Sequence, residues 1–133
     1  MVEIEAGARL EAAEYRSLRA AVGWSAPLAD DAALQAALAR TWNVVAREAG
    51  AVVGMGRLLD DGALYATVWD MIVAPEAQRR GIGTAVLQHL LRQAAGRTIV
   101  ALVATAAGRG LYERHGFRAE DGGGTGMFLR PAR

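Results

Sequence analysis

The sequence predicts an α/β fold in which a mixed, mostly antiparallel sheet carries helices on both faces. Between residues 42 and 74, three segments rich in apolar residues are separated by short turns, a pattern typical of an antiparallel meander. An amphipathic pattern over residues 81–95 and a nearly all-apolar run over residues 98–104 then indicate a strand–helix–strand unit. Both parts fit one layered domain over residues 1–133.

The N-terminal part is expected to contain one strand and two helices. Residues 2–5 alternate apolar and acidic side chains, which indicates a short edge strand. Apolar residues recur at helical spacing over residues 9–22, and Gly23 stands where that helix should stop. Asp30 is placed to cap a second helix, which should run to about Arg40.

The central part is expected to contain three strands and the longest helix. The strands cover residues 42–48, 51–59 and 63–74, and glycine-containing turns separate them. Pro75 ends the third strand because its ring prevents regular pairing. The pattern over residues 81–95 places its apolar side chains on one helical face.

The C-terminal part is expected to complete the sheet. The run over residues 98–104 is apolar at nearly every position, so we expect a strand buried on both faces. Residues 107–114 should form a short helix that ends at Gly116. Residues 117–120 and 127–130 would pair as terminal strands, joined by a glycine-rich connection.

Composition limits the classes of function. Fifteen basic and 14 acidic residues give a net charge of +1, which provides no electrostatic reason to expect nucleic acid or a membrane surface as a partner. The chain has no cysteine and only two histidines, so we expect no disulfide, no thiolate nucleophile and no metal site. No apolar run has the length of a signal peptide or a membrane span, so we expect a cytoplasmic protein.

The chemically informative segment is Gln-Arg-Arg-Gly-Ile-Gly-Thr at residues 78–84, at the start of the long helix. A helix start presents backbone N–H groups without partners and favours negative charge. Gly81 and Gly83 leave those groups accessible, and Arg79 and Arg80 add cationic donors, so the segment is suited to a phosphate or diphosphate. The alternative is that the glycines only permit close helix packing and the arginines form a solvated face.

Two other phosphate-binding motifs do not fit this segment. A P-loop requires a lysine followed by serine or threonine after its last glycine, and the segment has neither in that place. The dinucleotide fingerprint requires a third glycine, and Val86 occupies that position.

Three signals together resemble the GNAT superfamily of acyl-CoA transferases. Gln78, Gly81 and Gly83 match its Gln/Arg-x-x-Gly-x-Gly/Ala signature. Residues 70–76 resemble its fourth strand and entry turn, and residues 111–117 resemble its Tyr-x-x-x-Gly-Phe helix end. The resemblance implies the fold described above, acetyl-CoA as cofactor, and transfer of an acetyl group to an amine.

The resemblance also implies where the cofactor lies. Its pantetheine arm would pair with the backbone of the fourth strand, by strand addition. Its diphosphate would lie on the glycine-containing turn. The candidate cofactor-binding residues are therefore Met71, Ile72, Val73, Gln78, Arg79, Arg80, Gly81, Ile82, Gly83 and Thr84.

Tyr112 is the candidate general acid. A phenol with an ordinary pKa of about 10 is able to donate a proton to the sulfur that leaves. A backbone N–H near Ile72 would stabilise the negative charge that develops on the carbonyl oxygen. The alternative is that Tyr112 only packs on its short helix.

Two departures from the family pattern concern the catalytic groups. Thr105 occupies the position at which many relatives carry a cofactor-binding Asn. The strand over residues 98–104 lacks the glutamate that many relatives use as general base. Asp70 is the nearest carboxylate, so it is either that base or a hydrogen-bonding group at the strand; otherwise a water chain takes the proton, or the amine arrives partly neutral.

The first two helices usually wall the acceptor site in this family, which makes Tyr15, Trp24 and the loop over residues 23–27 the candidate substrate-binding elements. Trp24 alternatively plugs the core. We therefore expect transfer of acetyl from acetyl-CoA to a primary amine of a small molecule or peptide by direct attack. The alternative function is an inert acyl-CoA-binding sensor, and a homodimer is possible.

Overall fold

The computed structural model describes residues 1–24, 29–119 and 123–130, and it divides into two compact units. The first unit covers Met1–Val103 and the second covers Ala104–Arg133.

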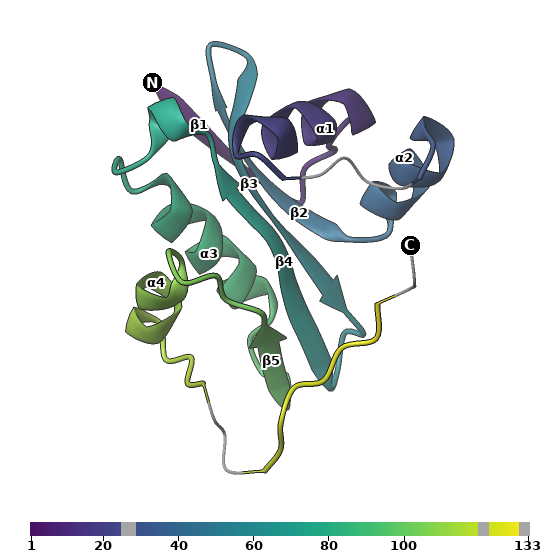
Figure 1. Ribbon diagram of the computed structural model, residues 1–133, viewed down its shortest axis with the longest axis vertical. Helices are drawn as coiled ribbons and strands as arrows, with labels where there is room; N and C mark the ends of the chain where they lie inside the picture. Colours follow the sequence, from purple (N-terminus) through teal and green to yellow (C-terminus); the bar gives the residue numbers. More distant parts are fainter. Residues whose placement is uncertain (25–28, 120–122, 131–133) are drawn as a thin grey trace. The chain divides into compact units, whose positions relative to one another are not determined.

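The first unit is built on a five-stranded sheet with the strands in sequence order (Figure 1). The strands are β1 (Val2–Ala6), β2 (Trp42–Glu48), β3 (Ala51–Asp60), β4 (Tyr65–Val73) and β5 (Ile99–Leu102). Strands β1 to β4 pair antiparallel, and β5 pairs parallel with β4. The predicted mixed, mostly antiparallel sheet is confirmed.

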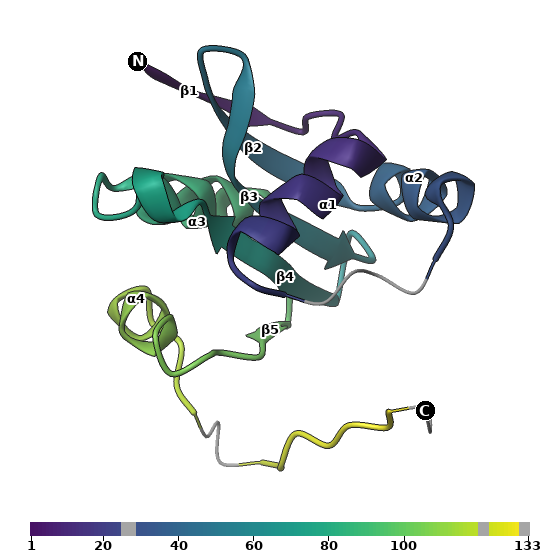
Figure 2. The same cartoon turned by 45° about the horizontal axis from the view of Figure 1, so that its top comes forward.

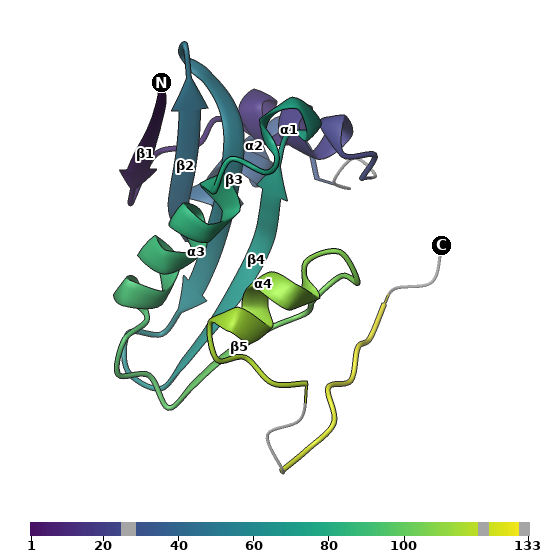
Figure 3. The same ribbon diagram turned by 90° about the vertical axis from the view of Figure 1, so that its left-hand side faces the viewer.

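Helices cover both faces of this sheet, as predicted (Figures 2 and 3). Helix α3 (Ile82–Gln93) packs on one face, and α1 (Ala12–Ala21) and α2 (Asp31–Ala39) lie on the other. Asp30 caps α2 as expected, because its carboxylate accepts a hydrogen bond of 2.8 Å from the backbone N–H of Ala33.

Close approach of α3 depends on two glycines of β3. A Cβ atom at Gly54 would lie 2.8 Å from Ile82 Cγ2, and one at Gly56 would lie 2.6 Å from Leu90 Cδ1. Side chains at these positions would push the helix outward, so the glycines set the distance between α3 and the sheet.

The expected strand over residues 98–104 is shorter than predicted and is not buried on both faces. Ile99 is 46% exposed, whereas Val100 and Leu102 pack against the core. Helices α1 and α2 make their main sheet contacts with β2, β3 and β4, and the side chains of Ile99 and Ala101, which share one face of β5, are exposed. The apolar run therefore indicated a strand correctly and its burial wrongly.

The second unit contains helix α4 (Arg109–Arg114). The predicted terminal strands are absent from the described residues 117–119 and 127–130, while residues 120–122 of this region lie outside the described ranges. Met127, Phe128 and Leu129 are exposed, so burial of their side chains does not offset the entropy lost in ordering a strand.

Candidate active site

Strand β4 parts from β5 halfway along its length. The parallel ladder runs from Tyr65 to Val68 of β4. Beyond that point, β4 continues to Val73 with β3 on one side only, among the residues that the structure describes. The predicted pantetheine-binding residues 71–73 lie on this open edge, which suits the addition of an extended ligand.

A β-bulge lies within the open part of β4. Arg57 pairs with Trp69 and Met55 pairs with Ile72, so Asp70 and Met71 together oppose one residue of β3. Asp70 has a φ of 53°, a left-handed conformation that aspartate tolerates better than most residues. The bulge changes the direction of the side chains that follow it in β4.

The turn before α3 has the geometry expected of an anion cradle. Gly81 has a φ of 81° and forms the N-cap of α3, and a Cβ atom there would meet nothing within 4 Å. The N–H groups of the first helical turn have no partner inside the helix. Gln78 ties this turn to the end of β4, because its side-chain amide donates a hydrogen bond of 3.0 Å to the Val73 carbonyl. These residues fit a diphosphate joined to an extended arm.

The two arginines of the turn differ in their contacts. Arg80 forms a two-point ion pair with Glu48 at the end of β2, and one of its contacts, Nη1 to Oε1, is 3.1 Å. This guanidinium lowers the pKa of the Glu48 carboxyl. Arg79 forms no ion pair within residues 1–24, 29–119 and 123–130, and it is exposed.

Asp70 is the centre of a partly buried polar cluster. Its Oδ2 accepts hydrogen bonds of 2.8 Å from both the Tyr15 hydroxyl and Arg57 Nη1, and its Oδ1 accepts one of 3.1 Å from Arg19 Nη1. The Asp70 side chain is 12% exposed. Arg57 also donates to the Thr41 hydroxyl, at 3.1 Å. We call Tyr15, Arg19, Thr41, Arg57 and Asp70 the Asp70 cluster.

The two predicted substrate-binding residues meet at Arg19. Its guanidinium lies 5.5 Å from the centroid of the Tyr15 ring and 5.3 Å from that of the Trp24 ring. Tyr15 is only 5% exposed, and burial, followed by the charge of Asp70, raises its pKa. Trp24 lies at the end of a described range, and residues 25–27 of the predicted loop lie outside the described residues.

Sequence reasoning missed Arg19 as a member of this cluster. A signal was present, since Arg19 follows Tyr15 by four positions and therefore lies on the same helical face. The sequence alone also could not assign Arg57 to a face of the sheet, because a bulge reverses the alternation of side chains along a strand. The structure assigns Arg57 to the face of α1, where its guanidinium lies 5.4 Å from the Tyr15 ring centroid.

Tyr112 lies in α4, in the second unit. Its ring makes an edge contact with Phe117, with 6.0 Å between the centroids. Burial raises the pKa of its phenol. The hydroxyl of Thr105 accepts a hydrogen bond of 3.2 Å from the Gly108 N–H, so this residue supports the start of α4. The position of Tyr112 beside the reacting sulfur stays a prediction.

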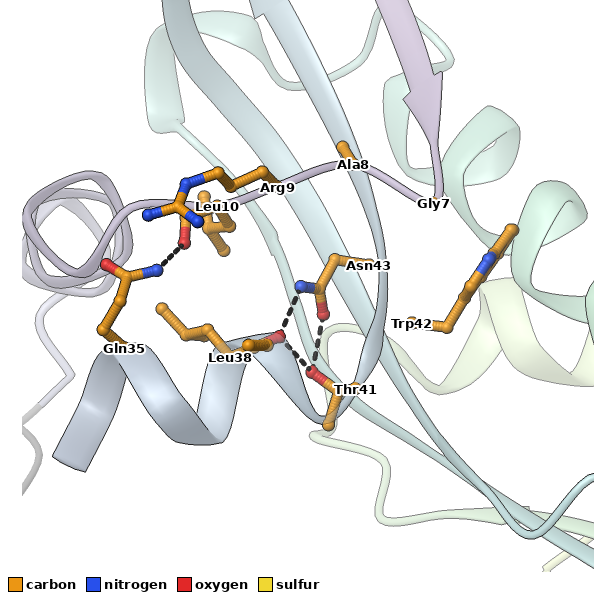
Figure 4. A pocket seen from close by; sticks show the side chains of 10 residues that line it. Gly7, Ala8, Arg9, Leu10, Gln35, Leu38, Thr41, Trp42 and Asn43 are labelled. Carbon is orange, nitrogen blue, oxygen red and sulfur yellow. Dashed lines mark hydrogen bonds between the residues drawn. The ribbon is translucent and has the colours of Figure 1, made fainter. Parts of the chain in front are cut away.

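A pocket of about 270 Å³ lies between the segment that enters α1 and the α2–β2 connection (Figure 4). Its polar side chains bind neighbouring groups of the protein. Gln35 donates to the Leu10 carbonyl at 2.9 Å, Asn43 donates to the Leu38 carbonyl at 2.9 Å, and the Thr41 hydroxyl donates to Asn43 Oδ1 at 2.7 Å. These bonds connect the segment that enters α1 and the start of β2 to α2. Thr41 also belongs to the Asp70 cluster, so it links the pocket to that cluster.

The described residues form neither a metal-binding cluster nor a membrane-spanning helix. No group of three or more His, Cys, Asp or Glu side chains there is arranged to hold a metal ion. None of the described helices combines the length and the apolar character that a membrane crossing requires.

Known proteins are similar to this chain in sequence and in fold. The model of the acetyltransferase (GNAT) domain matches residues 39–119. GCN5-related N-acetyltransferase 2, chloroplastic, of Arabidopsis thaliana is 38% identical over 82 residues, which are 60% of this chain and 32% of that protein. The chain thus spans about a third of the length of this relative.

Two solved structures show the likeness in three dimensions. A GNAT family acetyltransferase of Streptococcus pneumoniae is 29% identical, with a TM-score of 0.83 and complete coverage of both chains (100% and 100%). A predicted acetyltransferase of Clostridium acetobutylicum, solved with acetyl-CoA, has a TM-score of 0.73 at 20% identity and covers 98% of this chain and 96% of its own. With the matched domain covering more than half of its residues, the chain belongs to the GNAT superfamily of acetyltransferases.

Proposed function

We propose that this protein transfers an acetyl group from acetyl-CoA to a primary amine of a small molecule or peptide. The observation that carries the proposal is the continuity of two features within the first unit. The open edge of β4 leads, through the tie from Gln78 to Val73, directly into the glycine turn at the start of α3. An extended arm that ends in a diphosphate matches that order of features.

The residues of the open edge and of the turn divide the binding of acetyl-CoA between them. Backbone groups of residues 71–73 pair with the extended arm, and the N–H groups of residues 81–84 bind the diphosphate. Arg79 and Arg80 add positive charge at the rim of the turn. Bound acetyl-CoA supplies the acetyl group as an activated thioester.

Direct attack by the amine requires one proton donor and a path for one proton to leave. We assign the donor role to Tyr112, whose raised pKa keeps the phenol protonated near neutral pH, so that it is able to protonate the leaving sulfur. We assign Asp70 to positioning, because two guanidinium groups and a phenol already donate to its oxygens. The amine then loses its proton to water.

The first experiment measures the binding of acetyl-CoA. Acetyl-CoA should raise the unfolding midpoint of the protein, because a ligand of the folded state stabilises it. Gly83→Glu should remove most of that rise by placing a carboxylate against the diphosphate. An unchanged midpoint of the wild-type protein at millimolar acetyl-CoA would contradict the proposed cofactor.

Release of free thiol in the presence of a panel of primary amines then tests the transfer. We expect release that depends on both acetyl-CoA and an amine. Tight binding of acetyl-CoA without release for any amine would favour a sensor over an enzyme.

A further inference from the structure

Helices α1 and α2 do not cover the whole of their face of the sheet. The part where β4 pairs with β5 is left exposed. Arg57 contacts Tyr15 of α1, and its partner across the β3–β4 ladder is Trp69, so Trp69 lies on the same face. Side chains alternate along β4, so Tyr65 shares this face, together with its β5 partner Ile99. Tyr65 is 55% exposed and Trp69 is 43% exposed.

The indole of Trp69 is held in place by a hydrogen bond. Its Nε1 donates to the Thr67 hydroxyl, two residues earlier on the same face, at 2.9 Å. An aromatic ring fixed in this way offers a flat apolar surface that loses little rotational freedom when a ligand binds. The bond also satisfies the polar atom of the indole, which leaves the ring face for apolar contact.

Trp69 lies where the two strands part. It is the first residue of β4 beyond the ladder with β5, and it directly precedes Asp70. The open edge assigned above to the acetyl donor begins at the same point. A molecule bound against Trp69 is therefore at the entrance to the proposed reaction site.

The charge of the neighbouring cluster restricts what binds there. Two arginines and one aspartate give the Asp70 cluster an excess of one positive charge, and the Asp70 oxygens are engaged by three donors. The cluster therefore does not attract an ammonium group. Affinity for the acceptor must therefore come from the rest of the acceptor molecule and not from its amino group.

We propose that Trp69, fixed by Thr67 and extended along the strand by Tyr65, is a subsite for an aromatic ring of the acceptor. The proposal rests on the proposed function and specifies its substrate class as primary amines that carry an aryl group on a short alkyl chain. The ring stacks on the indole, and the short chain brings the nitrogen toward the point where β4 and β5 part.

The test compares three amines in acetyl transfer: 2-phenylethylamine, 2-cyclohexylethylamine of similar size, and propylamine. The wild-type protein should prefer the aromatic amine in kcat/KM. Trp69→Ala should raise the KM for 2-phenylethylamine about tenfold, which corresponds to about 1.4 kcal/mol. The same variant should change kcat/KM for propylamine less than about twofold, since propylamine has no ring to stack.

Two further variants separate stacking from a general structural effect. Trp69→Phe should restore most of the affinity for 2-phenylethylamine, and Thr67→Val should give an intermediate KM because it releases the indole. Leu64→Ala, at an exposed apolar residue in the turn before β4, is the matched control and should behave like the wild type. An equal loss for all three amines in Trp69→Ala, or no loss for the aromatic one, would overturn the subsite.

Equilibrium binding keeps this proposal separate from the proposed function. Calorimetric titration of 2-phenylethylamine into the wild-type protein with CoA should show binding that Trp69→Ala weakens by the same factor as the KM. If no amine is acetylated but this binding difference remains, the enzyme assignment fails and the aromatic subsite stands. If amines are acetylated without any preference for the ring, the subsite fails and the enzyme assignment stands.

Discussion

Glu48, at the end of β2, holds Arg80 of the turn before α3 in a two-point ion pair. The turn that is proposed to bind a diphosphate thus has one of its two cations already occupied by a carboxylate. The other cation, Arg79, has a backbone φ of 63°, and its side chain is exposed. Glu48 would therefore compete for Arg80 with a diphosphate bound at this turn.

Removal of this competition should tighten cofactor binding. We expect Glu48→Gln to lower the Kd for CoA about two- to fivefold, equivalent to about 0.5–1 kcal/mol. Titration calorimetry at low and high salt measures it, and the gain should shrink as salt screens the charges. Glu5→Gln, which removes an exposed carboxylate paired with Arg47, is the matched control.

The gain should also depend on the diphosphate itself. S-acetylpantetheine, which lacks the phosphates, should bind equally to wild type and Glu48→Gln, and Arg80→Gln should abolish the difference for CoA. Weaker binding of CoA to Glu48→Gln would instead show that the carboxylate positions Arg80 for the ligand.

Tyr112→Phe tests the proton donor. The variant keeps the ring that contacts Phe117 and loses only the hydroxyl, so we expect kcat to fall about 10²-fold with less than a twofold change in the Kd for acetyl-CoA. Because burial raises the pKa of this phenol, the wild-type rate should not fall through its ionisation between about pH 7 and 9. Unchanged turnover in the variant would remove Tyr112 from the mechanism.

Asp70→Asn tests the positioning role. The substitution leaves two partly buried guanidinium groups without their shared carboxylate, so the free energy of unfolding should fall by about 2–4 kcal/mol. Urea unfolding measures this loss, and Asp31→Asn, in an exposed ion pair with Arg16, should lose less than about 1 kcal/mol.

The pH profile of the same variant distinguishes positioning from general base catalysis. If Asp70 only positions its neighbours, the rise of kcat/KM with pH should follow the pKa of each amine in both proteins. A rising limb that is common to all amines and disappears in Asp70→Asn would identify Asp70 as the base.

Acid should weaken the ion pair between Asp60, at the end of β3, and Arg97, which precedes β5. Arg97 binds both carboxylate oxygens of Asp60, at 2.7 and 2.9 Å, and this contact lowers the pKa of Asp60. The stability that the pair contributes is present above the unfolded pKa of about 3.9 and is lost as pH falls through the lower folded value. Asp60→Asn should flatten the loss of stability below about pH 4, measured by urea unfolding. An identical pH dependence in the variant would exclude this ion pair as a source of acid sensitivity.

Local patterns were sufficient for most of the first unit. The apolar segments and short turns of the meander, the amphipathic pattern of α3 and the cap at Asp30 each depend on neighbours within a few residues, and the structure confirms them. The left-handed Gly81 at the start of α3 was predictable for the same reason, since a tight entry to a helix favours glycine. The burial of β5 was not predictable, because it depends on which strands α1 and α2 reach.

The sequence by itself determined the family, the order of the elements in the first unit and the glycine turn, because these are read from residues close together in the chain. Only the tertiary structure decided that Asp70 accepts from Tyr15, Arg19 and Arg57, that Glu48 binds Arg80, and that Trp69 shares the face of α1. Those contacts join residues many positions apart, and the bulge at Asp70 changes strand parity between them. Their partners are therefore fixed by packing and register, which no local pattern contains.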